Sequence, residues 1–292
     1  MGMSPRRIVA VLGQGIVPPT TPVLTATDPA VLGDGLVETM HVRQGRPWLV
    51  DEHLDRLTRA ADLLGFAVPD QRELADLLAT TCAAWPADQE GVLRLVCTNG
   101  PADEGAPTAF TTLDPVSQRV TWARRAGVSV ITLSLGIAAT ARANAPWLLG
   151  GIKSTSRAVH RASQRWAATR GADDVLWTSL EGYALEGPTS NVVWLEDDVL
   201  CTVPAAETGI LPGVTAAWLL AHAGEFGWRA EERMVTPDEL RHADGVWLTS
   251  SIRGLAEVRA LDGTPLPPSP HTRAIRELLG YPVVDDSSPE DR

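Results

Sequence analysis

A carboxylate and a candidate anion-binding turn lie close together in the sequence, between residues 183 and 215. Glu186 stands near the end of a short apolar run and is followed by Gly187, Pro188 and three small polar residues. The stretch closes on GILPGVT at 209–215, where turn residues open onto a helical pattern. Unpaired backbone N–H groups and the helix dipole make the start of a helix attractive to a phosphate. The stretch therefore predicts a buried carboxylate close in sequence to a phosphate site.

Lys153 is the second group that could do chemistry. It lies where a strand or loop meets the start of a predicted helix that runs to Arg170. Composition alone favours an exposed lysine at such a position. The preceding residues 148–152, LLGGI, are apolar and tight, and burial of this kind desolvates an amine and lowers its pKa. We therefore interpret Lys153 as a candidate reactive amine.

The first 120 residues are predicted to alternate strands and helices as one α+β unit. Leu54, Leu57, Ala61 and Leu64 recur at helical spacing, and Gly65 ends that helix, which also carries Arg56. Strands are expected at 8–12, 36–42, 48–50, 91–98 and 108–113, and helices from 51 and from about 69 to 85. The run 124–127, RRAG, is interpreted as a linker, so we expect an N-terminal domain at 1–121 and a C-terminal domain at 126–292.

The second half predicts a further set of strands and helices. Strands are expected at 128–135, 174–178, 192–195, 199–203, 228–234, 246–250 and 258–261. Short helices are expected at 216–223, 237–241 and 272–279, and residues 285–292 are interpreted as frayed. The helix that ends near Arg170 has Val159, Ala162 and Trp166 on one face.

Composition excludes several classes of protein. The 292 residues are 44% hydrophobic with a net charge of −11, and no basic block is present, which argues against a non-specific nucleic-acid binder. Cys82, Cys97 and Cys201 lack metal-ligand spacing, so no metal site is predicted, and Cys97 and Cys201 are interpreted as buried thiols in a reducing compartment. No apolar stretch of 18 residues occurs, which predicts neither a membrane span nor a secretory signal. We expect a cytoplasmic protein.

Five motifs, taken in order and spacing, resemble those of the class IV aminotransferase-like proteins, the fold-type IV enzymes that use pyridoxal 5'-phosphate (PLP). They are GDGLVET at 33–39, EHLDRL at 52–57, GIKS at 151–154, LEGPTSNVVWL at 185–195 and GILPGVT at 209–215. The resemblance implies an α+β, two-domain fold: a smaller N-terminal α/β sandwich-like domain and a larger C-terminal PLP-binding domain with a β-barrel-like core. It also implies a homodimer.

The resemblance assigns roles to particular residues. Lys153 matches the lysine that forms the Schiff base with PLP and later moves the substrate's α-proton. Glu186 matches the carboxylate that pairs with the pyridine nitrogen, which keeps the ring an electron sink. Arg56 matches the phosphate-binding arginine, and the backbone N–H groups of Val214 and Thr215, with the Thr215 hydroxyl, match the phosphate cup. A hydroxyl at Ser250 or Ser251 is expected to stand in for a further phosphate contact, because the family's position falls near Gly254.

Three departures from the family concern the substrate. A tyrosine found shortly after the lysine in some members falls near Arg157, and an arginine that several members place before a glycine is replaced by Asn99. Asn99 and Arg157 are therefore the candidate substrate-binding residues, with Arg94 and Arg253 as other arginines that could meet a substrate carboxylate. The family often has an arginine near His41, and its replacement here is expected to alter the substrate pocket.

The resemblance leaves three functions open. The first is a PLP-dependent 4-amino-4-deoxychorismate lyase that releases pyruvate to give 4-aminobenzoate in folate biosynthesis; the GDGLVET and SSIRG segments favour it. The second is an aminotransferase that uses D- or branched-chain amino acids and a 2-oxo acid. The third is a non-catalytic PLP-binding protein of the same fold. In each case the partner is a small amino compound, not a nucleic acid or a membrane.

Overall fold

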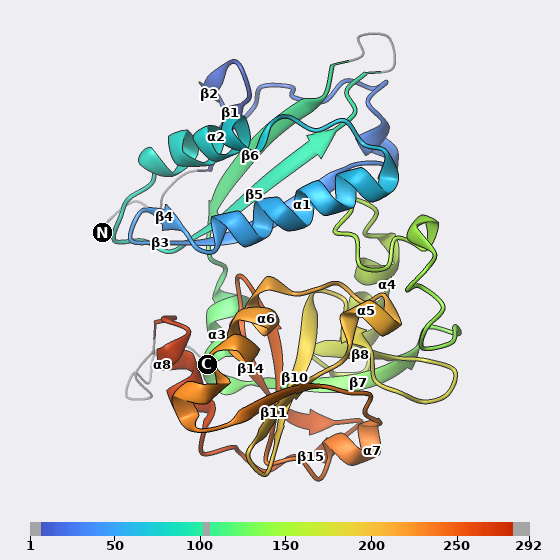
Figure 1. Ribbon diagram of the computed structural model, residues 1–292. Helices are drawn as coiled ribbons and strands as arrows, with labels where there is room; N and C mark the ends of the chain where they lie inside the picture. The colour runs from blue at the N-terminus through green and yellow to red at the C-terminus, as the bar shows by residue number, and fades with distance from the viewer. Residues whose placement is uncertain (1–6, 102–105, 283–292) are drawn as a thin grey trace. The chain divides into compact units, whose positions relative to one another are not determined.

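The computed structural model describes residues 7–101 and 106–282 (Figure 1). Packing divides the chain into two units: the first comprises Met1–Ser117 with Ala145–Arg157, and the second comprises Gln118–Asn144 with Ala158–Arg292. Lys153 therefore belongs to the first unit although it follows residues of the second. The boundary expected between 121 and 126 stays a prediction, and the fraying expected at 285–292 lies outside the described residues.

An antiparallel sheet of six strands forms the first unit. The strand order is β2-β1-β6-β5-β3-β4. The strands are β1 (Ile8–Val11), β2 (Gly15–Val17), β3 (Leu36–Arg43), β4 (Arg46–Pro47), β5 (Gly91–Thr98) and β6 (Thr108–Pro115); the helices are the 3-10 helices η1 (Pro29–Leu32) and η2 (Pro146–Leu148) and the α-helices α1 (Val50–Leu64) and α2 (Gln71–Ala83). Leu54 and Leu57 of α1 and Leu74 of α2 share one core with Met40 and Leu93 of the sheet, so both helices cover the same face.

The returning segment 145–157 is fixed by the backbone of β3. The Val37 N–H donates to the Lys153 carbonyl at 2.9 Å, and the Thr155 N–H donates to the Gly35 carbonyl at 2.8 Å. Ser154 forms an antiparallel bridge with Leu36 between these two bonds. Lys153 is thus held beside the start of β3 as if it belonged to a short extra strand.

A nine-stranded sheet forms the second unit. Its order is β12-β11-β10-β13-β14-β7-β8, with β9 paired to β10 and β15 to β14. The strands are β7 (Val128–Ser134), β8 (Asp174–Thr178), β9 (Glu186–Gly187), β10 (Ser190–Glu196), β11 (Val199–Thr202), β12 (Arg229–Glu232), β13 (Gly245–Ser250), β14 (Gly254–Leu261) and β15 (Thr264–Pro265). The helices are α3 (Gln118–Ala126), α4 (Ala158–Ala168), α5 (Ala205–Thr208), α6 (Val214–Ala221), η3 (Ala223–Phe226), α7 (Pro237–Leu240) and α8 (Thr272–Leu278).

This second sheet curls around its own core. Leu176 of β8 and Cys201 of β11 lie near opposite ends of the strand order, yet both belong to one buried cluster with Trp194 of β10. The curl agrees with the predicted α+β fold and its barrel-like C-terminal core.

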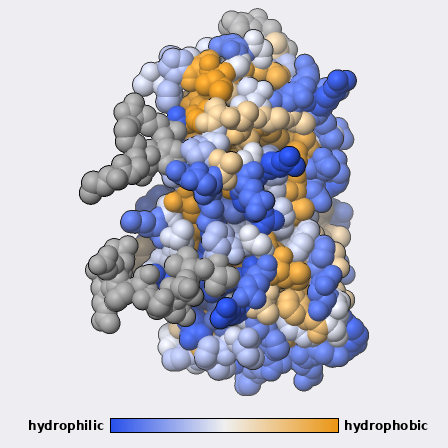
Figure 2. Space-filling model, turned by 90° about the vertical axis from the view of Figure 1, so that its left-hand side faces the viewer, coloured by the Kyte–Doolittle hydropathy of each residue, from blue (hydrophilic) through white to orange (hydrophobic). Residues whose placement is uncertain are grey.

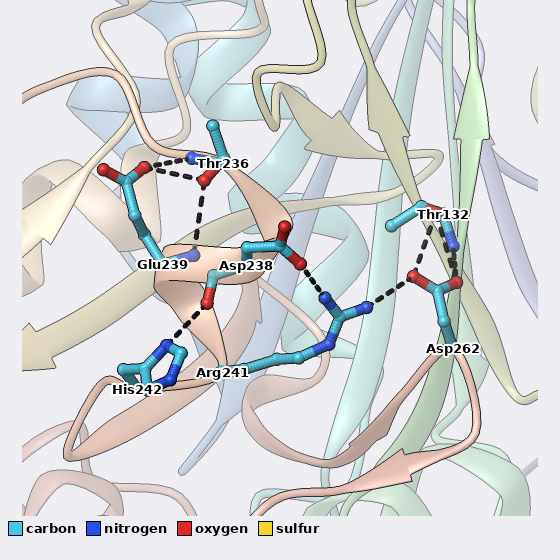
Figure 3. A network of polar contacts seen from close by, with 7 residues as sticks. All are labelled: Thr132, Thr236, Asp238, Glu239, Arg241, His242 and Asp262. Atoms are coloured by element: carbon cyan, nitrogen blue, oxygen red, sulfur yellow. Dashed lines mark hydrogen bonds and ion pairs between the residues drawn. The ribbon is translucent and has the colours of Figure 1, made fainter.

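One corner of the second unit is fixed by a polar network (Figure 3). Thr236 and Glu239 form a capping box at the start of α7, which satisfies backbone donors that a short helix leaves unpaired. Arg241 pairs with Asp238 and, at 3.2 Å, with Asp262, and the Thr132 N–H donates to Asp262 at 2.7 Å. The network joins α7 to β7 and to the turn after β14.

Two of the expected segments differ in the structure. Residues 124–126 of the run interpreted as a linker form the end of helix α3. The Arg124 side chain is buried, and its guanidinium donates to the Ile252 and Arg253 carbonyls. Residues 48–50 do not form a full strand: β4 ends at Pro47 and α1 already begins at Val50. Helix α3 was not predicted at all, and α1 begins one residue earlier than expected.

Helix α4 forms where expected, but its apolar face is exposed. Val159 and Trp166 are 61% and 51% exposed, and Ala167 is the buried residue of this helix. Figure 2 shows that on one face of the molecule hydrophobic residues form patches separated by hydrophilic ones. Isolated exposed apolar side chains are common on protein surfaces.

The cysteines fit the expectation from the sequence. All three cysteines are free and buried, as predicted for Cys97 and Cys201. Burial raises the pKa of the Cys82 and Cys97 thiols to about 12, so both stay protonated. Within residues 7–101 and 106–282, no helix is both long and apolar enough to cross a membrane. In the same ranges no group of acidic, histidine and cysteine side chains could hold a metal ion.

Candidate functional site

Glu38, His53 and Arg56 form a buried ionic cluster in the first unit. Glu38 lies on the face of β3 that α1 covers, and the other two residues lie one turn apart on α1. Arg56 grips the carboxylate with two bonds, Nε to Oε1 at 2.8 Å and Nη2 to Oε2 at 2.7 Å. His53 Nδ1 lies 2.6 Å from Oε2. The side chains of Glu38 and His53 are 1% and 0% exposed.

Charge inside this cluster is set by burial and by the Arg56 cation. Burial acts to raise the pKa of Glu38, but the Arg56 guanidinium and the hydrogen bonds from His53 and Arg56 outweigh it and hold that pKa far below its usual range. Burial lowers the pKa of His53, and the Arg56 and Lys153 cations lower it further against the opposing effect of Glu38. The cluster therefore consists of an ionised Glu38, a cationic Arg56 and a neutral His53.

The amine of Lys153 belongs to the same neighbourhood. The Val37 N–H, from the residue before Glu38, donates to the Lys153 carbonyl at 2.9 Å, and the Lys153 cation adds a small lowering of the pKa of His53. The Lys153 side chain is half-buried. With Arg56 and Lys153 there are two cations and, in Glu38, one anion. This part of the first unit thus carries an excess positive charge that suits an anionic ligand.

Glu186 is the corresponding acidic group of the second unit. It lies on the short strand β9, opposite Asn191 of β10. Arg142 Nη2 donates to its Oε1 at 3.2 Å, and the Leu211 N–H donates to its Oε2 at 3.1 Å. The Glu186 side chain is 10% exposed. The predicted buried carboxylate is present, and a charged partner compensates its burial.

The start of helix α6 has the features of an anion cup. Gly213 is the N-cap, and no side chain caps the helix there. A Cβ at position 213 would lie 1.8 Å from Asn191 Oδ1, so only glycine fits between this amide and the helix. Thr215 is 2% exposed, and its hydroxyl has no hydrogen-bond partner among the described residues. A buried hydroxyl without a partner is costly, which points to a missing ligand.

Asn191 connects the Glu186 carboxylate to the anion cup. Its Nδ2 donates to the Leu211 carbonyl at 2.8 Å, while the Leu211 N–H donates to Glu186. Its Oδ1 lies against Gly213. The Asn191 side chain therefore lies between the Glu186 carboxylate and the start of the helix. No motif in the sequence assigned it a role.

Several predicted substrate-binding residues already have partners. Asn99 Oδ1 accepts the Ala67 N–H at 3.1 Å. Arg94 is exposed and pairs with Asp114 at 3.1 Å, and Arg253 pairs with the fully buried Asp174 at 2.8 Å. Arg157 is half-buried in the first unit.

The polar turn after β13 is fixed by hydrogen bonds of Ser250 and Ser251. The Ser250 hydroxyl accepts the Arg253 N–H at 3.3 Å. The Ser251 carbonyl accepts the Tyr281 hydroxyl, and the Tyr281 ring lies against Gly254 and the Arg124 guanidinium. The choice between Ser250 and Ser251 as a phosphate contact stays open. His41, where an arginine was expected nearby, is fully buried with Nε2 at 2.6 Å from Glu90 Oε2.

Sequence reasoning missed four residues of these sites and one property of a fifth. Glu38, His53, Asn191 and Arg142 had no assigned role, although the first three stand inside the quoted motifs. A further signal concerns Lys153, which is the only lysine in the 292 residues, whereas 24 arginines are present. In a chain that otherwise uses arginine for every cation of this kind, a single lysine indicates a task that an arginine cannot perform.

Comparison with known proteins identifies the family of the chain. The family model for amino-transferase class IV matches residues 35–261. The chain is 38% identical over 288 residues to a bifunctional aminodeoxychorismate lyase / D-amino acid transaminase of Mycobacterium tuberculosis, which covers 96% of this chain and 100% of that protein.

Two solved structures resemble this chain along most of its length. The PLP-bound form of a hypothetical aminotransferase from Mycobacterium tuberculosis superimposes with a TM-score of 0.90 at 39% identity, over 94% of this chain and 98% of that one. A putative 4-amino-4-deoxychorismate lyase from Legionella pneumophila has a TM-score of 0.77 at 26% identity, over 90% and 96% of the two chains. The predicted fold, with its two curled sheets, is confirmed.

The donor set suits PLP, the cofactor of this family. PLP carries an aldehyde, a basic ring nitrogen and a phosphate, which call for an amine, a carboxylate and an anion cup. The chain offers Lys153, Glu186, and the Thr215 hydroxyl at the uncapped start of α6. The chain belongs to the class IV aminotransferase family and is a PLP-dependent enzyme.

Proposed function

We propose that the protein is a PLP-dependent 4-amino-4-deoxychorismate lyase that releases pyruvate and gives 4-aminobenzoate. The observation that carries this proposal is the relation along the whole chain to the mycobacterial protein named for this lyase activity. The resemblance to a putative lyase structure supports it. By this proposal the enzyme serves folate biosynthesis in the cytoplasm and acts as a homodimer.

We propose that Lys153, Glu186, Arg56, Val214 and Thr215 all bind one PLP molecule. Bound PLP supplies an electron sink for the carbon that carries the substrate's amino group. Lys153 would hold the cofactor covalently and, once the substrate's amino group has replaced it there, its free amine would take the proton from that carbon. Glu186 holds the ring nitrogen, while Arg56 and the start of α6 bind the phosphate. Departure of pyruvate makes the product ring aromatic.

For the substrate carboxylates we propose Asn99 and Arg157, which occupy the positions where the sequence departs from the family's substrate-side residues. Arg94 and Arg253 each meet a carboxylate of the chain already. The Asn99 amide oxygen is used by the Ala67 N–H, so a direct contact from Asn99 would come from its NH₂ group. An Arg157→Met variant is expected to raise the KM for the substrate more than it lowers kcat, because it removes a binding contact.

The alternative function is an aminotransferase that acts on D-amino acids with a 2-oxo acid as acceptor. The name of the mycobacterial relative includes a D-amino acid transaminase activity, and a D-alanine aminotransferase of Bacillus licheniformis is 27% identical over 88% of this chain. Branched-chain substrates belong to the same alternative, since a relative of that kind is 26% identical over 88% of the chain. These reactions also need Lys153 and Glu186, so the site alone does not separate them.

An assay with defined substrates tests the choice. The purified holoenzyme is incubated with 4-amino-4-deoxychorismate, and 4-aminobenzoate and pyruvate are measured. A parallel panel pairs D- and L-amino acids with 2-oxoglutarate and pyruvate. Equal amounts of 4-aminobenzoate and pyruvate support the lyase proposal. Amino transfer without any 4-aminobenzoate would replace it with the transaminase alternative.

A Thr215→Val variant tests the anion cup. Valine keeps the shape of threonine but removes the buried hydroxyl, so we expect PLP to bind the apoenzyme about 10-fold more weakly, as for loss of a hydrogen bond to a charged group. The apoenzyme itself should be as stable as wild type or more so, because no described residue bonds this hydroxyl. PLP affinity is measured by fluorescence titration and stability by urea unfolding.

Thr202→Val is the matched control for this experiment. Its hydroxyl donates to the Val192 carbonyl at 2.8 Å, so the same substitution should lower stability and leave PLP affinity unchanged. If the two variants lose stability alike and keep their PLP affinity, Thr215 does not contact phosphate.

A further inference from the structure

We infer that Arg142 is a positioning residue for Glu186, which it holds in place for the ring nitrogen of the cofactor. This inference rests on the proposed function, because it assigns a second residue to the role proposed for Glu186. Arg142 does not belong to any of the motifs that identify the family, and it precedes Lys153 by 11 residues in an irregular stretch.

The contact between the two side chains is buried and charged. Arg142 Nη2 lies 3.2 Å from Glu186 Oε1, and the two side chains are 12% and 10% exposed. The other carboxylate oxygen accepts the Leu211 N–H. Each oxygen therefore has its own donor, and together the two bonds fix both the position and the plane of the carboxylate.

The backbone of Arg142 is itself held in place. Gly209 has a φ of +65°, and a Cβ there would lie 2.5 Å from the Arg142 carbonyl carbon and 2.6 Å from the Ala143 nitrogen. The Ala143 N–H donates to the Thr140 carbonyl at 3.2 Å. Because the run 209–211 touches Arg142 at one end and Glu186 at the other, it sets the separation of the ion pair.

Electrostatics give this pair a direct effect on the cofactor. Burial penalises an ionised carboxylate, whereas a guanidinium at hydrogen-bond distance favours it. A carboxylate that stays ionised accepts a hydrogen bond from a protonated ring nitrogen and leaves the proton there. Arg142 thus fixes the acceptor before PLP arrives, which reduces the ordering needed on binding.

The test compares PLP with its 1-deaza analogue, in which carbon replaces the ring nitrogen. Wild-type apoenzyme, Arg142→Met and Arg142→Lys are titrated with both compounds, and the dissociation constants are measured. We expect Arg142→Met to bind PLP about 10-fold more weakly and the analogue with the wild-type affinity to within about 3-fold. Arg142→Lys keeps the charge and should restore most of the PLP affinity. Arg229→Met, which changes an exposed arginine, is the surface control and should bind like wild type.

Each outcome separates the inference from the proposed function. Equal weakening of both compounds in Arg142→Met, or no weakening of either, overturns the positioning role of Arg142. A wild-type enzyme that binds PLP and the analogue equally overturns the role proposed for Glu186, whereas the lyase proposal itself fails only in the assay with 4-amino-4-deoxychorismate. Should Arg142→Met fail to fold, Arg142→Gln, which also removes the charge, takes its place: it should bind PLP more weakly and the analogue like wild type, and the inference is lost if both affinities fall alike.

Discussion

A Lys153→Ala variant is expected to lose turnover by about 10³-fold or more, because we propose that this lysine is both the amine that binds PLP covalently and the base that moves the substrate proton. The loss of turnover can be assigned to a single amine. Lys153 is the only lysine of the sequence, so no second lysine can replace it. The measurement is the rate of product formation in single-turnover experiments with PLP in excess.

Covalent capture gives this prediction a readout other than activity. Borohydride reduction of the wild-type holoenzyme should add one PLP group to the chain, and peptide mass spectrometry should place it on residue 153. Lys153→Arg, which keeps the charge but not the nucleophile, should bind PLP reversibly and carry no label after reduction. A label elsewhere in the chain, or a variant that keeps its activity, would rule out the assignment.

The second large effect is expected at Glu38. A Glu38→Gln substitution leaves the buried Arg56 cation without its bidentate partner, so we expect the free energy of unfolding to fall by about 3 kcal/mol or more. Asp114→Asn in strand β6 of the same sheet is the matched control. It breaks ion pairs with Arg7 and Arg94, whose side chains are 59% and 45% exposed, and should cost about 1 kcal/mol or less. Urea unfolding of both variants at pH 7 measures the difference.

The dependence of this effect on pH follows from the direction of the Glu38 shift. The folded-state pKa lies below the unfolded value, so Glu38 contributes its stability above about pH 4.3, the unfolded value. That contribution is lost as the pH falls towards the folded pKa. The gap in stability between wild type and Glu38→Gln should therefore shrink between pH 5 and pH 3. A gap that stays constant over this range would show that Glu38 does not act through its charge.

His53 adds a separate dependence at higher pH. The pKa of His53 is lowered in the folded state. As the pH falls through about 6.5, His53 therefore binds a proton in the unfolded chain but not yet in the folded chain. Stability falls as a result. The two groups thus weaken the first unit in successive pH ranges, His53 first and Glu38 second.

Local patterns in the sequence predicted most elements of the fold. The leucines of α1 and the glycine at 65 gave a helix that the structure ends at Leu64, because helical spacing and a left-handed C-cap are local properties. The exposed face of α4 shows the limit of this reasoning. Spacing puts Val159 and Trp166 on one face, but only the tertiary packing determines whether anything covers them. Likewise the two arginines of RRAG suggested a solvated linker, whereas Arg124 is buried by carbonyls of the distant residues 252 and 253.

The residues of the candidate sites also divide into those that a local motif identifies and those that it does not. Lys153, Glu186 and Thr215 could be named from motifs, since each stands in a short run that carries its own backbone geometry. Their partners could not be named. Glu38 meets Arg56 across 18 residues and Arg142 meets Glu186 across 44, and no local pattern records a charge pair between distant segments. The unpaired hydroxyl of Thr215 was also invisible, because burial without a partner is a property of the folded chain.

The return of residues 145–157 to the first unit affects how the chain is made. A ribosome that has completed residue 117 has delivered all strands of the first sheet, but not the piece whose backbone bonds to β3 or the lysine within it. During synthesis this unit stays incomplete until residue 157 has emerged, by which time part of the second unit is already exposed. A truncation after residue 117 consequently yields neither a finished domain nor a reactive amine, and any dissection of the enzyme into separately expressed halves has to carry that thirteen-residue insert with the N-terminal piece.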